Sequence, residues 1–145
     1  MKIDVRKCMI SDAPIIRKLI QQDLGYEYPA DQFEANLRRL MSSSSNIIYV
    51  AESGDQVLGY AHACDYGIIY GPPTKALSSI VVKEEYRRYG VANALMDAVE
   101  KWAKANGAAS VRLYSGSERK DAVAFYKSRG YEYFKSDYQF KKALK

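Results

Sequence analysis

Residues 87–92, Arg87-Arg88-Tyr89-Gly90-Val91-Ala92, join an apolar run to an amphipathic pattern. The run before them, ALSSIVV at 76–82, predicts a strand, and apolar residues at helical spacing after it predict a helix that ends at Asn106-Gly107. The first N–H groups of a helix lack partners, and the helix dipole is positive there. With a glycine and two arginines, this junction therefore predicts an anion site, although it is neither a P-loop nor a triple-glycine dinucleotide turn.

The rest of the chain alternates between strand and helix patterns around this junction. Ser53-Gly54-Asp55 predicts a hairpin between two β-rich runs. Expected strands cover 3–7, 47–52, 56–64, 76–82, 110–115 and 131–140, and expected helices cover 11–24, 31–41, 91–106 and 121–129. The order is β-α-α-β-β-β-α-β-α-β, which predicts an α/β layered domain without an internal repeat.

Composition restricts both the architecture and the chemistry. A chain of 145 residues with 48% apolar residues predicts one domain, 1–145, with a single core. One histidine excludes a multi-histidine metal centre, so no metal is expected. Cys8 and Cys64 form no C-x-x-C arrangement and are expected to be reduced packing residues. No leader and no apolar stretch of about 18 residues is visible, so we expect a cytoplasmic protein without a membrane partner.

The formal net charge of +5 is unevenly distributed. Residues 1–82 carry 8 basic and 9 acidic side chains, whereas residues 83–145 carry 14 and 8. This asymmetry favours an anionic ligand on the second half and leaves the first half free to face a cation. The alternative interpretation is that these charges are scattered over the surface and bind no particular ligand.

Two motifs give the chain a family resemblance. Arg87-x-x-Gly90-x-Ala92 resembles the Q/R-x-x-G-x-G/A signature of the GNAT superfamily of N-acetyltransferases, in which this turn holds the pyrophosphate of coenzyme A. Residues 122–131, AVAFYKSRGY, are similar to the A-x-x-F-Y-x-x-x-G-F/Y helix of the same family. The resemblance, which extends to the element order over essentially the whole chain, implies a three-layer fold with a mixed, mostly antiparallel sheet flanked by helices.

The resemblance also implies a cosubstrate, acetyl-CoA, and its contacts. In the family the pantetheine arm lies where the fourth strand splays from the fifth, and the N–H of Ile80 would face the thioester oxygen. Arg119 stands where many members carry asparagine, so either Ser117 supplies that polar contact or Arg119 meets phosphate. The implied coenzyme-binding residues are Ile80, Val81, Val82, Arg87, Arg88, Tyr89, Gly90, Val91, Ala92, Asn93 and Ser117.

Tyr126 matches the family's general acid, and it would give its proton to the coenzyme sulfur. A base for the acceptor amine is harder to identify. Many members place a glutamate on the fourth strand, and residues 76–82 contain no carboxylate. Asp65, Glu27 and His62 remain alternatives that would act through water. For His62 we expect first a packed or edge histidine, because it shares strand parity with Leu58, Tyr60 and Cys64.

The resemblance therefore implies an N-acetyltransferase that moves acetyl directly to a small cationic amine or to a peptide or protein amine. Expected acceptor contacts are Tyr26, Glu27, Tyr28, Asp65 and Tyr70. The missing strand glutamate motivates one alternative, a non-catalytic acyl-CoA-binding module. Nucleic acid is not an expected partner, because the basic residues cluster around the coenzyme site rather than forming a continuous face. A homodimer is compatible with the family and is left open.

Overall fold

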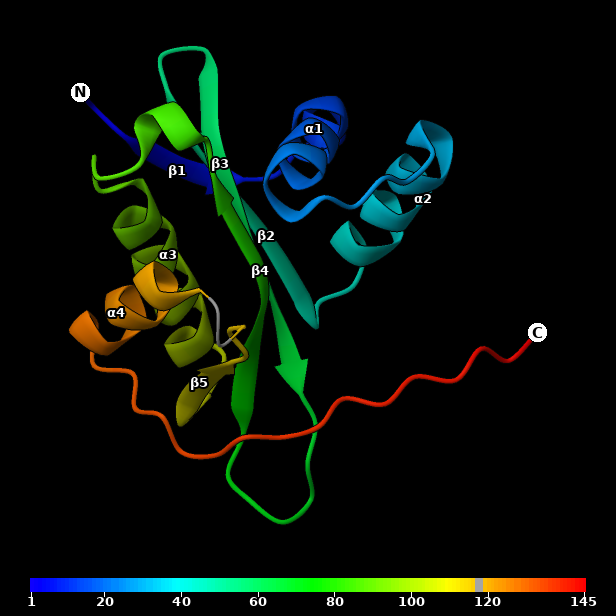
Figure 1. Ribbon diagram of the computed structural model, residues 1–145, viewed down its shortest axis with the longest axis vertical. Helices are drawn as coiled ribbons and strands as arrows, with labels where there is room; N and C mark the ends of the chain where they lie inside the picture. Colours follow the sequence, from blue (N-terminus) through cyan, green and yellow to red (C-terminus); the bar gives the residue numbers. More distant parts are fainter. Residues whose placement is uncertain (117–118) are drawn as a thin grey trace. The chain divides into compact units, whose positions relative to one another are not determined.

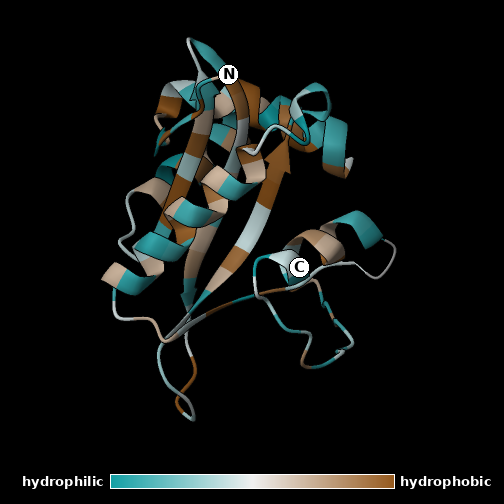
Figure 2. Cartoon of the chain, turned by 90° about the vertical axis from the view of Figure 1, so that its left-hand side faces the viewer, coloured by the Kyte–Doolittle hydropathy of each residue, from teal (hydrophilic) through white to brown (hydrophobic). Residues whose placement is uncertain are grey.

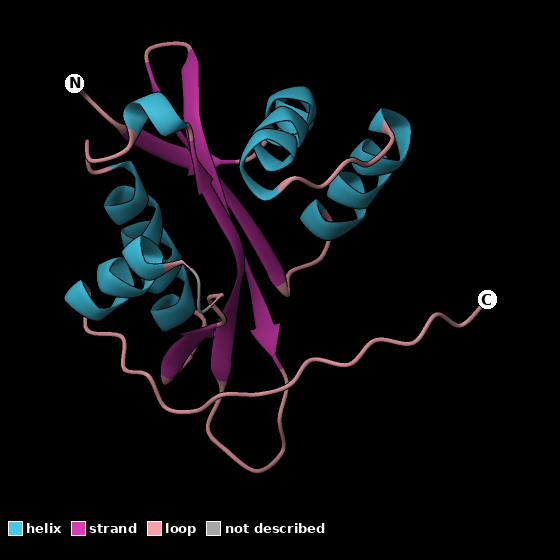
Figure 3. Ribbon diagram, in the orientation of Figure 1, coloured by secondary structure: helices cyan, strands magenta, loops and turns pink. Residues whose placement is uncertain are grey.

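The computed structural model describes residues 1–116 and 119–145, which divide into two compact units, Met1–Leu113 and Tyr114–Lys145. The described part of the second unit contains one helix, α4 (Lys120–Ser128). Two 3₁₀ helices, η1 (Ile10–Asp12) and η2 (Glu84–Tyr86), belong to the first unit. The other elements of the first unit are β1 (Asp4–Lys7), α1 (Ala13–Leu24), α2 (Ala30–Met41), β2 (Asn46–Ser53), β3 (Gln56–Tyr66), β4 (Thr74–Val82), α3 (Val91–Ala105) and β5 (Ser110–Leu113) (Figures 1 and 3).

The first unit is built on a five-stranded sheet with the strand order β1-β2-β3-β4-β5. The first four strands pair antiparallel, and β5 pairs with β4 in parallel. Helices α1 and α2 pack on one face of the sheet and α3 packs on the other (Figure 1). This arrangement confirms the predicted three-layer fold with a mixed, mostly antiparallel sheet.

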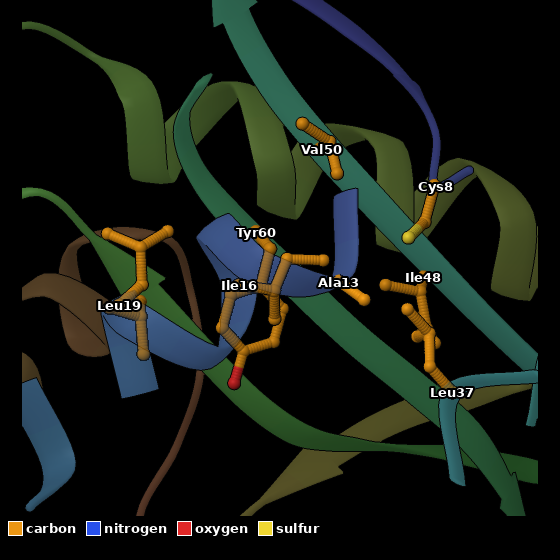
Figure 4. Packing of buried hydrophobic residues seen from close by; sticks show 9 residues of the cluster. Cys8, Ala13, Ile16, Leu19, Leu37, Ile48, Val50 and Tyr60 are labelled. Atoms are coloured by element: carbon orange, nitrogen blue, oxygen red, sulfur yellow. The ribbon is translucent and has the colours of Figure 1, made fainter. Parts of the chain in front are cut away.

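Apolar side chains fill the space on both faces of the sheet. Ile16 and Leu19 of α1 and Leu37 of α2 pack with Val50 and Tyr60 of the sheet (Figure 4). On the other face, α3 buries an apolar stripe that recurs every three or four residues, as an amphipathic helix does. Figure 2 shows the strands banded with hydrophobic residues. The buried residues of α3 are Val91, Leu95, Met96, Val99 and Ala103.

A charged network ties the first strand to the first helix. Arg6 of β1 donates to both carboxylate oxygens of Asp12, at 2.8 and 2.9 Å, and the backbone N–H of Met9 donates to the same carboxylate at 2.7 Å. The guanidinium of Arg6 lowers the pKa of Asp12. Burial raises the pKa of the neighbouring Cys8 thiol to about 12, which fits the expected packing role.

The sequence pattern at 131–140 predicted a final strand, and the structure has none there. The residues after α4 are irregular, and Tyr133, Phe134 and Phe140 are exposed. A strand is stabilised by hydrogen bonds to a partner, and the described part of the second unit contains no strand to pair with. The alternating aromatic residues of this segment therefore form a local sequence pattern that is not accompanied by hydrogen-bonded pairing to another strand.

Within residues 1–116 and 119–145, every helix is too short or too polar to cross a membrane. The same ranges hold no group of three or more His, Cys, Asp and Glu side chains suited to a metal ion.

Candidate active site

The site begins where β4 leaves its neighbour β5. β5 pairs only with the first four residues of β4, and the register ends at Leu77 opposite Leu113. A β-bulge follows at once, because His62 pairs with Ser79 while Ala63 pairs with Leu77, which leaves Ser78 as the extra residue. β4 then continues to Val82 alongside β3 alone. Within residues 1–113, no strand pairs with the other edge of β4 beyond the bulge.

Two residues of β4 direct their backbone groups toward this open edge. The N–H of Lys83 donates to the carbonyl of Leu58 at 2.8 Å, so the backbone at Lys83 faces β3. Because backbone direction alternates along a strand, Val81 also faces β3, while Ile80 and Val82 face the open edge. Both residues were predicted to pair with an extended ligand, and a strand edge can accept such a ligand. Val81 instead supports the strand, with its side chain in the core.

The chain after β4 forms a tight turn into α3. Arg88 and Gly90 both have left-handed backbone conformations, with φ values of 69° and 88°. A left-handed arginine is uncommon and costs about 1 kcal/mol or more, which is the kind of strain that concentrates at functional sites. The first helical hydrogen bond runs from Ala94 N–H to Gly90 O, at 3.0 Å.

The turn leaves room for a ligand at the helix start. The N–H groups of Val91 and Ala92 precede the first helical bond, so the helix itself gives them no acceptor. A Cβ built on Gly90 would meet no atom within 4 Å, so space is open beside this backbone. Tyr89 is exposed and lies 6.5 Å from the Tyr86 ring. The turn thus has the features of a site for an anionic group at a helix N-terminus.

The two arginines of the turn have different surroundings. Arg87 pairs with Asp23 of α1, and its Nε donates to the carbonyl oxygen of Val82 at 3.4 Å. These two contacts hold the Arg87 side chain in place. Arg88 is exposed. The ion pair lines an open hollow between α1, the end of β4 and η2.

The predicted acceptor residues fall into two groups that the structure keeps apart. Tyr26, Glu27 and Tyr28 are exposed on the connection between α1 and α2, which the Arg17 Nε ties down by donating to the Tyr28 carbonyl at 2.6 Å. The remaining two residues lie at the end of β3 and in the β3–β4 loop, which extends past the far end of the sheet (Figure 1). They are Asp65 and Tyr70.

Asp65 is already engaged. Its carboxylate pairs with Lys75 of β4, and this contact lowers the pKa of Asp65. The same ammonium lies 5.0 Å from the centre of the Trp102 ring of α3. A carboxylate with a lowered pKa is a weaker base, so Asp65 suits ion pairing better than proton removal.

The predicted acid belongs to the second unit. Tyr126 lies on α4, and its ring contacts Phe125 and Tyr131 edge-on, with centroid distances of 5.2 and 5.8 Å. Burial raises the pKa of Tyr126, and Arg119 partly opposes this shift. The hydroxyl therefore keeps its proton at neutral pH. Ser117 lies outside the described residues.

Two polar contacts on the α1 face of the sheet escaped the sequence analysis. Tyr60 of β3 and Ser79 of β4 are joined through their hydroxyl oxygens at 2.8 Å, and burial raises the pKa of Tyr60. His62 Nε2 lies 2.8 Å from Asn46 Oδ1. The partners are 19 and 16 residues apart, so only the strand register reveals that they meet.

A comparison of the sequence with protein-family models identifies the family of this chain. The model described as the acetyltransferase (GNAT) family matches residues 13–131, which is most of the chain. The chain belongs to this family. The matched range includes the open edge of β4, the Gly90 turn and Tyr126.

Individual relatives are more distant. An uncharacterised N-acetyltransferase of Methanocaldococcus jannaschii is 30% identical over 96 residues, which is 64% of this chain and 42% of that protein's own length. The fold resembles that of the aminoglycoside N-acetyltransferase AAC(6′)-Iy in complex with a CoA-linked bisubstrate analogue, with a TM-score of 0.88, 20% identity and coverage of 99% and 100% of the two chains.

A second aminoglycoside acetyltransferase, from an uncultured soil sample and in complex with sisomicin, has a TM-score of 0.83 at 16% identity, with 99% and 97% of the two chains covered. At these identities the structural matches establish the fold alone.

Proposed function

We propose that this chain is an N-acetyltransferase that moves the acetyl group of acetyl-CoA directly to a primary amine. The observation that carries the proposal is the open edge of β4, which leads into the Gly90 turn and the N-terminus of α3. A strand edge suits the amides of a pantetheine arm, and a helix start suits the pyrophosphate at its end. The order of these two features along the chain matches the order of the groups along coenzyme A.

The residues present fit coenzyme A by their chemistry. Ile80 and Val82 offer backbone groups at the edge. The first turn of α3 offers N–H donors, and the open space at Gly90 lets a phosphate approach the backbone. Arg88 is exposed beside this turn and carries positive charge. These features support assigning the site to an extended ligand with an anionic end.

The chemistry then divides between two groups of this chain. The N–H of Ile80 donates a hydrogen bond to the thioester oxygen and stabilises the negative charge that builds on it as the amine nitrogen bonds to the carbonyl carbon. Tyr126 donates its phenolic proton to the sulfur as the carbon–sulfur bond breaks, the bonded nitrogen loses one proton to solvent to become the amide, and Tyr126 regains a proton from solvent. The products are an amide and the free thiol, and the enzyme forms no covalent bond to acetyl.

The acceptor that fits this proposal best is a small cationic amine. Solved aminoglycoside acetyltransferases with this fold, two of which are described above, support that class. Tyr26, Glu27 and Tyr28 place aromatic rings and a carboxylate on an exposed connection, and both groups attract ammonium ions. A peptide or protein amine is the second class. A homodimer and a cytoplasmic location stay predictions.

Release of free thiol tests the proposal. Acetyl-CoA is incubated with the protein and with separate polyamines, aminoglycosides and peptides, and the thiol is measured with a colorimetric reagent. We expect amine-dependent release with at least one cationic amine. Saturable binding of acetyl-CoA without release with any amine would instead favour a non-catalytic acyl-CoA-binding module.

A further inference from the structure

The proposed reaction needs a group that removes a proton, and this inference rests on that proposed function. A primary amine has a pKa of about 10, so it reaches the site as an ammonium ion and must lose a proton before it attacks. The open half of β4 carries no carboxylate. The proton acceptor must therefore come from another element.

Neither of the two carboxylates that the sequence analysis considered, Asp65 and Glu27, lies beside the open half of β4. Asp65 pairs with Lys75 and lies next to the end of β3, beside the β3–β4 loop. Glu27 is fully outside the sheet, on the exposed α1–α2 connection, and accepts a hydrogen bond from Gln21 at 3.3 Å. Neither residue pairs with β4 beyond its bulge.

His62, unlike these carboxylates, lies next to the open half of β4. It pairs across the ladder with Ser79, the residue before Ile80 in β4. Side chains of directly paired residues lie on the same face, about 5 Å apart at Cβ. Along the same face of β3, Tyr60 is 3% exposed beneath α1, whereas His62 is partly exposed. A partly exposed imidazole thus lies one strand away from the edge that Ile80 faces.

The contact with Asn46 fixes which nitrogen of His62 can accept a proton. The side-chain oxygen of Asn46 is an acceptor, so Nε2 must donate to it, and the unshared pair of the neutral ring is on Nδ1. In the described part of the chain, no protein group donates a hydrogen bond to Nδ1. Nδ1 therefore has the lone pair that a proton acceptor needs.

The surroundings keep this ring neutral. Burial lowers the pKa of His62 and is the one cause of the shift. The ionisable neighbours on its own strand are Tyr60 and Cys64. The residues paired with His62 on β2 and β4 are the uncharged Ile48 and Ser79, and its contact on β2 is the uncharged side chain of Asn46. The negative charge of Asp23 of α1 contributes to the raised pKa of Tyr60.

We propose that His62, oriented by Asn46, receives the proton of the acceptor ammonium through one water molecule. The ammonium gives a proton to the water, the water gives one to Nδ1, and the resulting imidazolium returns its proton to solvent after transfer. The amine nitrogen is left with the lone pair that forms the new bond to the acetyl carbon. His62 then replaces the carboxylate that β4 lacks.

Asn46→Asp tests this role, with Asn36→Asp on the exposed face of α2 as the matched control. A carboxylate at position 46 accepts the same Nε2–H bond and stabilises the imidazolium, so the pKa of His62 rises by about one unit or more. Because the chain has one histidine, a proton NMR titration of its ring reads this pKa without ambiguity. The rate is followed as the pH profile of kcat/KM for thiol release.

We expect the acidic limb of the profile to follow the NMR pKa of His62 in the wild type, to move up with it in Asn46→Asp, and to stay in place in Asn36→Asp. A one-unit shift lowers kcat/KM about tenfold at a pH below the limb. His62→Gln, which keeps a polar side chain, should lose the limb and about 10²-fold in kcat/KM at neutral pH.

An NMR pKa that moves while the kinetic limb does not would overturn the role of His62, as would a His62→Gln variant that is folded and fully active. If Asn46→Asp does not fold, the His62→Gln comparison decides. A wild-type protein that binds acetyl-CoA and acetylates no amine overturns the proposed function itself, and this inference falls with it.

Discussion

Substituting Gly90 by alanine tests the assignment of the turn to a phosphate group. Gly90 has φ of +88°, and a Cβ there would meet no protein atom within 4 Å. The substitution therefore costs backbone strain of about 1 kcal/mol and no clash, which lowers Tm by about 4 °C in a chain of this size. The added methyl group does fill the space beside the first turn of α3, where a pyrophosphate would approach.

The expected effect on coenzyme binding is larger than the effect on stability. A phosphate held away from the backbone loses about one charge-assisted hydrogen bond, worth about 1.5–3 kcal/mol. The Kd for CoA in isothermal titration calorimetry should therefore rise about 10- to 100-fold.

Gly107 provides the matched control at the other end of α3. Its φ is +80°, and a Cβ there also meets nothing within 4 Å. Gly107→Ala should lose about the same stability and bind CoA within about twofold of the wild type, an interval well inside 1 kcal/mol. Equal CoA affinities for Gly90→Ala and Gly107→Ala would refute the placement of the phosphate at Gly90.

Three further predictions concern single side chains. Tyr126→Phe should lower kcat by about 10²-fold with the Kd for CoA kept, and an unchanged kcat would remove the acid role. Asp23→Asn releases Arg87 from its ion pair, so CoA should bind about two- to fivefold more tightly by calorimetry, with a stronger dependence on salt. Asp12→Asn should cost about 2–3 kcal/mol at pH 7 in denaturant unfolding, because it leaves Arg6 without its main partner. The pKa of Asp12 is lowered in the folded state, so this stabilisation is present above the unfolded pKa near 3.8 and disappears as pH falls through the folded value.

Local patterns predicted most of the first unit. The apolar spacing of α3 and its stop at Asn106-Gly107 gave its bounds to within a residue, and the Gly54 turn joined β2 and β3 as expected. These signals are encoded by neighbours in sequence, so a single sequence contains them. The prediction of a strand at 131–140 was wrong. A strand needs a partner strand elsewhere in the chain, and local alternation of residues does not specify that partner.

The site could be predicted only in part. The motif positions led to the edge of β4 and to the Gly90 turn, yet the contacts that refine the site join distant residues. Asp23 and Arg87 are 64 residues apart, and their pairing depends on how α1 packs against the sheet. The β2–β3 register brings Asn46 to His62, and the β3–β4 register pairs His62 with Ser79 next to the bulge at Ser78. No local pattern specifies a bulge of this kind.

The most direct test of acetyl transfer follows the acetyl group itself. Acetyl-CoA labelled with ¹³C in the acetyl carbonyl is incubated with the protein and a cationic amine, and the products are identified by NMR and mass spectrometry. We predict that the label appears as an amide on the amine, in equal amount to the free CoA released, and that Tyr126→Phe slows this by about 10²-fold. A protein that binds acetyl-CoA while the label remains in the thioester, or appears only as acetate, would contradict the account.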